Sequence, residues 1–269
     1  MKVIAIFLIV VQHAWTPETD SLYFSLGYFD YGAIGVTLFL VASGLGLAAS
    51  KPALTNLSDL KNFYKTRLLR IYPSYWLFGL GFTIMLFPSL LNQIGNVDLW
   101  RLMTGFQSWG ATNAEQYYGQ INGTLWFIEI IVCMYLVFPL LYYLIKKKPK
   151  ATIVVLFVIS AVSQFYFISY TNYFQPYSWI PLCKVFEFGL GIFIIVKGKY
   201  PKTQSNWLVK YLSNISFYIF LTNSTLLNYF PYQIATFIIA LFAVSTFDYY
   251  ADKFLKWTAT FLWNDLVKD

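Results

Sequence analysis

His13 is the only histidine in the 269 residues of the chain, and it lies in an apolar run that begins beside Lys2. If this run is a helix, the two residues share one face and are separated by about 16 Å along the axis. An ionisable side chain inside a membrane helix is costly to insert and so points to function, and imidazole titrates near neutral pH. His13 is therefore a candidate general base. A histidine that bonds a neighbouring helix for packing alone is the alternative.

Two carboxyl groups lie in other apolar runs. Glu129 follows Trp126 by three residues, and a helix entering from outside would carry it to the depth of His13. A carboxylate that orients an imidazole makes a competent general base, so we expect Glu129 to hold the His13 ring. Glu187 follows Lys184 by three residues, which favours a self-neutralising pair over a catalytic role.

Residues 58–72 predict an amphipathic helix at the membrane surface, ended by Pro73. At 100° per residue, Arg67 projects into the apolar arc of this helix and Arg70 lies at its edge, whereas its two lysines lie opposite. Both guanidinium groups then point toward the protein, where a planar fork suits a phosphate or carboxylate. Arginines that snorkel or pair with acidic lipid are the alternative.

The composition places these residues in a polytopic membrane protein. The chain is 58% hydrophobic and only 12% charged, against about 25% charged residues in soluble domains. We expect an all-α transmembrane bundle of about eight spans that forms a single domain over residues 1–269. The eight apolar segments are residues 1–16, 31–50, 72–91, 125–145, 151–169, 178–197, 211–230 and 232–250.

The basic residues indicate topology. Of the 19 lysines and arginines, 17 fall on one side of the membrane when the eight segments alternate. This asymmetry puts both termini in the cytoplasm, and it accounts for the net charge of +7 without nucleic-acid binding. Cys133 and Cys183 lie in apolar runs without metal-ligand spacing, so no metal site is predicted.

Several segments of the chain carry patterns that occur together in one family of membrane proteins. Residues 2–5 run on to His13, residues 32–44 end in Ser-Gly, and residues 67–75 contain Arg-x-x-Arg. Residues 125–129 follow, with later stretches at 187–191 and 215–221. In this order the segments resemble the first helix, the second span, the Arg-x-x-Arg segment and later spans of the acyltransferase 3 family of integral membrane acyltransferases.

The resemblance implies transfer of an acyl group, most often acetyl from acetyl-CoA, across the cell membrane. The acceptor would be a hydroxyl of a cell-surface carbohydrate or lipid-linked glycan. On this reading Arg67, Arg70 and Lys2 hold the donor phosphates, and His13 acts as general base or transient acyl carrier. No cofactor is expected to stay bound, since acyl-CoA is a substrate. Residues placed with substrate binding are Lys184, Glu187 and Asn223.

The chain also departs from the family pattern. Lysine replaces arginine at position 2, Asn223 stands where a histidine is often found, and about eight spans replace about ten. Lysine lacks the bidentate fork of arginine, which weakens that position as a phosphate clamp. An inactive member acting as a partner subunit, and a membrane exporter of a glycan precursor, are the alternatives.

Overall fold

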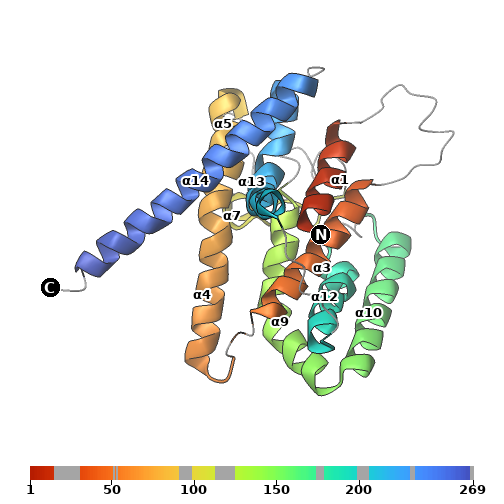
Figure 1. Ribbon diagram of the computed structural model, residues 1–269. Coiled ribbons are helices and arrows are strands. Elements are labelled where there is room, and N and C mark those ends of the chain that lie inside the picture. Colours follow the sequence, from red (N-terminus) through yellow and green to blue (C-terminus); the bar gives the residue numbers. More distant parts are fainter. Residues whose placement is uncertain are drawn as a thin grey trace.

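The computed structural model describes residues 1–14, 31–50, 52, 54–90, 99–112, 125–173, 179–198, 206–230 and 234–266. Every regular element within these ranges is a helix, which confirms the all-α prediction (Figure 1). Three of them are long and apolar enough to cross a bilayer, namely α3 (Tyr31–Ala49), α9 (Phe127–Lys147) and α10 (Pro149–Tyr170). The shorter α1 (Lys2–Ala14) is also apolar.

The remaining predicted spans differ from uniform apolar helices. The sixth is divided between a 3-10 turn, η3 (Pro181–Lys184), and α12 (Val185–Val196). The last two correspond to α13 (Trp207–Tyr229), which carries many polar side chains, and the 33-residue α14 (Ile234–Leu266). The count of eight spans and the cytoplasmic position of both termini stay predictions.

Helices α1, α3 and α12 pack closely because glycines remove side chains at their crossings. A Cβ on Gly35 of α3 would collide with the carbonyl oxygen of Ala5 in α1. One on Gly44 would collide with the carbonyl oxygen of Phe188 in α12, and one on Gly191 with that of Val41. Small residues let membrane helices approach in this way. The helix that carries His13 is therefore held on a rigid backbone contact.

We expect Gly44→Ala to destabilise the bundle by about 1–3 kcal/mol, because the backbones of α3 and α12 must separate. Gly46→Ala on the same helix is the matched control, since a Cβ there meets no atom within 4 Å. It should be neutral or stabilising by up to about 1 kcal/mol through helix propensity. Thermal unfolding of the detergent-solubilised variants measures both. Equal melting temperatures for the two variants would contradict this account of the crossing.

The amphipathic helix α4 (Leu57–Ser74) begins at Asn56, whose side chain accepts a hydrogen bond from the backbone nitrogen of Asp59 at 2.9 Å. Its apolar face packs on α9, where Phe63 stacks on Phe138 with ring centroids 5.3 Å apart. The Tyr64 hydroxyl also donates to the carbonyl of Leu136 at 2.9 Å. The predicted apolar arc therefore contacts protein.

The predicted helix stop at Pro73 is wrong. The helix continues through Pro73 into η1 (Tyr75–Gly81), a π-helix, and then α5 (Phe82–Leu86). Proline removes one backbone hydrogen bond and crowds the preceding turn. A π-helix with wider turns follows directly, and the helical backbone does not end at this proline.

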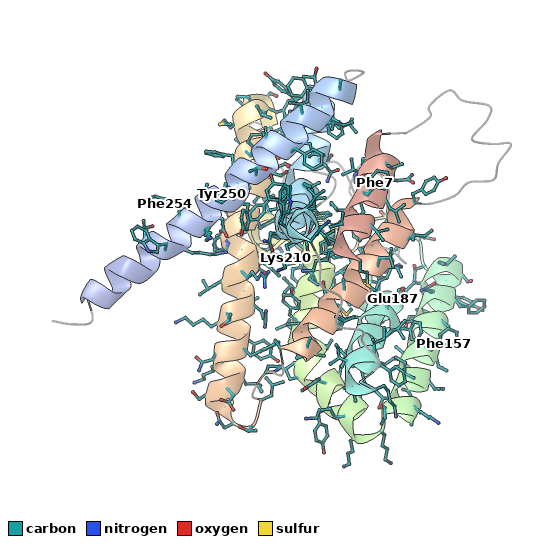
Figure 2. The ribbon with its side chains drawn as sticks, viewed as in Figure 1. Phe7, Phe157, Glu187, Lys210, Tyr250 and Phe254 are labelled. Atoms are coloured by element: carbon teal, nitrogen blue, oxygen red, sulfur yellow. The ribbon has the colours of Figure 1, made fainter. Side chains whose placement is uncertain are left out.

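Helix α10 lies at the edge of the bundle, joined to α9 by a tight connection at Lys148 (Figure 1). Its buried side chains are Leu156 and Ser160, whereas Phe157 lies on the outer surface (Figure 2). An apolar outer face of this kind suits contact with lipid. Helix α10 therefore forms an outer wall of the bundle.

Candidate active site

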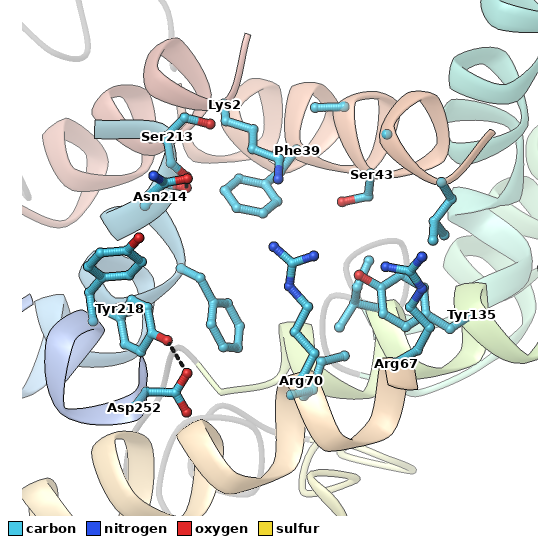
Figure 3. A pocket seen from close by; sticks show the side chains of 18 of the residues that line it. Lys2, Phe39, Ser43, Arg67, Arg70, Tyr135, Ser213, Asn214, Tyr218 and Asp252 are labelled. Atoms are coloured by element: carbon cyan, nitrogen blue, oxygen red, sulfur yellow. Dashed lines mark hydrogen bonds between the residues drawn. The ribbon is translucent and has the colours of Figure 1, made fainter. Parts of the chain in front are cut away.

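A cavity of about 560 Å³ opens between α1, α3, α4, α9, α13 and α14 (Figure 3). Its volume is in the usual range for small-molecule sites. Five cationic residues and one carboxylate line it, giving a formal charge of +4. The six are Lys2, Arg67, Arg70, Asp252, Lys253 and Lys256.

Arg67 and Arg70 both point into the cavity, as their helical phase predicts (Figure 3). Arg67 lies beside Tyr135, and Arg70 extends toward Lys2 (Figure 3). The guanidinium carbon of Arg67 also lies 5.6 Å from the ring centroid of Phe63. The two guanidinium groups and the Lys2 amine therefore converge on one volume.

Most of this positive charge is not neutralised by protein. Within the described ranges, Lys256 forms an ion pair with Asp252 at 2.6 Å, and Lys2, Arg67 and Arg70 form none. Converging cations without carboxylate partners are unfavourable unless an anion joins them. Guanidinium forks favour a phosphate there because it accepts paired, charge-assisted hydrogen bonds.

His13 lies farther along α1 and is held by Asn223 of α13. The Asn223 amide nitrogen donates to the carbonyls of Ile219 at 3.2 Å and Phe220 at 2.7 Å. Because carbonyls only accept, these contacts assign the amide orientation and turn its oxygen toward His13 Nδ1, 2.6 Å away. Nδ1 must then be the donor, which leaves the lone pair of the neutral ring on Nε2. The arrangement prepares Nε2 to accept a proton.

Aromatic side chains connect the cavity with this pair. Phe39 and Phe127 line the cavity, and their ring centroids are 5.7 Å apart. The Phe127 ring lies 5.2 Å from that of Phe220, whose carbonyl accepts from Asn223. Ring contacts therefore lead from the cavity wall to the turn of α13 that carries the partner of His13.

A family model described as an acyltransferase domain matches residues 1–194. The chain belongs to the acyltransferase 3 family. Its membership supports a membrane acyltransferase, and the matched range includes His13, Arg67 and Arg70. Neither the curated proteins nor the solved structures contain a match to this chain.

The expected hydrogen bond between Glu129 and the His13 ring is absent among the described residues, and Asn223 contacts Nδ1. On α9 the cavity is lined by Phe127, Ile131 and Tyr135, and Glu129 projects about 160° from the first two. Its carboxylate is fully buried, and both oxygens lack a hydrogen-bond partner among the described residues. The sequence indicated a similar depth but could not fix which side of α9 would face α1.

Lys184 and Glu187 form the predicted pair, with Nζ and Oε1 3.7 Å apart. Neither lines the cavity. Asn223, also assigned to substrate binding from the sequence, is fully buried and contacts His13. A substrate-binding role for Asn223 and for the ion pair stays a prediction.

The cavity contains residues that the sequence did not single out. Asp252 accepts a hydrogen bond from Tyr218 at 2.8 Å (Figure 3). It also accepts one from Ser74 at 3.1 Å and pairs with Lys256. Lys253 lies beside them. In the sequence the two lysines counted only toward topology, because the cavity contacts of α14 depend on how the helix packs.

Proposed function

We propose that this family member is an O-acyltransferase of the cell membrane that uses cytosolic acyl-CoA, most simply acetyl-CoA. The acceptor is a hydroxyl of a cell-surface carbohydrate or lipid-linked glycan. The observation that carries the proposal is one helix, α1, with Lys2 in a cationic cavity at one end and an oriented imidazole at the other.

The donor would enter with its phosphates against Arg67, Arg70 and Lys2. A rise of about 16 Å separates Lys2 from His13 along α1, which an extended pantetheine arm can approximately bridge. The arm would pass Phe39 and Phe127, whose apolar rings suit its methylene groups. This route brings the thioester toward His13 from the cytoplasmic side.

At His13, Nε2 would take the proton of the acceptor hydroxyl as its oxygen attacks the thioester carbonyl. The new C–O bond forms, the C–S bond breaks, and the proton passes from Nε2 to the departing CoA sulfur. The products are an O-acyl ester and free CoA, and the histidine regains its starting state. Transient acylation of Nε2, followed by attack of the hydroxyl, gives the same balance.

The proposal is tested by mass spectrometry of surface glycans from cells with and without the protein, fed isotopically labelled acetate. Labelled O-acetyl groups should appear only when the protein is present. Unchanged acetylation together with export of a glycan precursor would replace the proposal with the transporter alternative.

Asn223→Ala should lower the turnover number about tenfold or more and leave the KM for acyl-CoA unchanged, because the ring tautomer is no longer fixed. Asn214→Ala is the matched control, since Asn214 lines the cavity and should affect donor KM instead. Steady-state kinetics with purified protein separate the two effects. An increase in acceptor KM alone would return Asn223 to the substrate-binding role predicted from the sequence.

A further inference from the structure

The cations of the cavity are spread between its two ends. Arg67 lies beside Tyr135 at one end of the view, whereas Tyr218 and Asp252 lie at the other (Figure 3). Lys256 is bonded to Asp252 and so belongs to this second end, and Lys253 follows Asp252 in the same helix. Arg70 and Lys2 lie between the two ends (Figure 3). The end at α14 therefore offers cations of its own.

The end at α14 is held in place by the protein. Asp252 is 5% exposed and binds Tyr218 of α13, Ser74 of α4 and Lys256 of its own helix. This network fixes the lysine-bearing turn of α14 against the cavity wall. The Lys256 side chain nevertheless stays 44% exposed. Exposed area of this size on a cation that lines the cavity leaves room for an anion.

We infer that Lys253 and Lys256 form a separate phosphate subsite. It binds a phosphomonoester at the end of the donor molecule opposite the thioester. This inference rests on the proposed function. On the proposed route the pantetheine arm runs toward α1 and His13. The diphosphate attached to the arm therefore contacts Arg67, Arg70 and Lys2. The nucleotide phosphate of CoA then reaches α14.

Charge supports the same assignment. CoA carries about four negative charges near neutral pH, counting its diphosphate and its phosphomonoester. The cavity lining has a formal charge of +4. The subsite also lies outside residues 1–194, so the family match does not assign it. It would make this chain select a nucleotide thioester over a simple phosphopantetheine thioester.

The test compares acetyl-CoA with acetyl-dephospho-CoA, which lacks only the 3′-phosphate, as donors for the full-length protein in nanodiscs of neutral lipid. Wild-type protein should show a KM about 10- to 100-fold lower for acetyl-CoA, because charged hydrogen bonds to the phosphate are lost in the analogue. Lys253→Gln with Lys256→Gln should raise the KM for acetyl-CoA by the same factor and leave that for acetyl-dephospho-CoA unchanged. Lys148→Gln with Lys150→Gln, two exposed lysines away from the cavity, is the charge-matched control.

Equal loss with both donors would overturn the subsite while leaving acyl transfer intact. Binding of 3′,5′-ADP to the wild-type protein, measured by calorimetry, gives a second readout if the double variant fails to fold, and absence of binding would also overturn it. A lipid headgroup offers the same phosphate chemistry. If donor discrimination is absent in neutral lipid and the lysine variants respond only when phosphatidylglycerol is added, the subsite binds lipid and the inference is wrong. Failure of every donor would instead remove the proposed function.

Discussion

His13→Ala should reduce the rate of acyl transfer about 10²- to 10⁴-fold, the range that general acid–base catalysis usually contributes. The variant loses the ring that Asn223 orients, and the described part of the chain contains no other imidazole. The measurement is the O-acyl content of the acceptor, by mass spectrometry, at equal protein abundance. Donor binding should be unchanged because His13 does not line the cavity.

One control variant sharpens this result. Glu129→Gln, which removes a carboxylate on the opposite side of α9, should leave orientation of the imidazole intact. Unchanged acceptor acylation by His13→Ala would remove the imidazole from the mechanism. It would also favour the alternative of a non-catalytic partner subunit.

Arg67→Ala combined with Arg70→Ala should raise the KM for acyl-CoA about 100-fold or more, since each guanidinium would form charge-assisted hydrogen bonds to the donor phosphates. Both side chains are partly open to solvent, which limits the binding free energy that each contributes. Arg70→Lys keeps the charge but loses the fork, so its effect should be intermediate. Isothermal titration with CoA gives the same ranking without turnover.

The matched control for this pair is Lys61→Ala with Lys65→Ala. Both lysines lie on the exposed face of α4, and neither lines the cavity. This variant removes the same charge from the same helix and should bind acyl-CoA normally. Equal weakening by the two double variants would show that α4 acts through its net charge, and it would contradict a phosphate clamp.

Local features of the site could be predicted from the sequence. The helical phase of Arg67 and Arg70 alone predicted that both side chains face the protein, because the apolar arc of α4 must be buried. The spacing of Lys184 and Glu187 likewise predicted their ion pair, since residues three apart meet on one helix. These predictions depend only on the geometry of a single helix.

Contacts between distant segments could not be predicted in this way. Asn223 is 210 residues from His13, and its role depends on how α13 rotates against α1. Glu129 was assigned from depth, but the rotation of α9 decided its neighbours. The lysines of α14 enter the cavity only because Asp252 binds α4 and α13. These contacts depend on the rotation and packing of helices, which leave no local signature in the sequence.

The most direct test of acyl transfer through α1 uses sealed vesicles with acetyl-CoA, labelled in the acetyl group, on the cytoplasmic face and a glycan acceptor on the other face. With wild-type protein, label should appear on the acceptor across the membrane, and with His13→Ala it should not. Equal labelling of the acceptor with both proteins would contradict the account. Labelling that occurs only when the acceptor is on the same face as the donor would also contradict it.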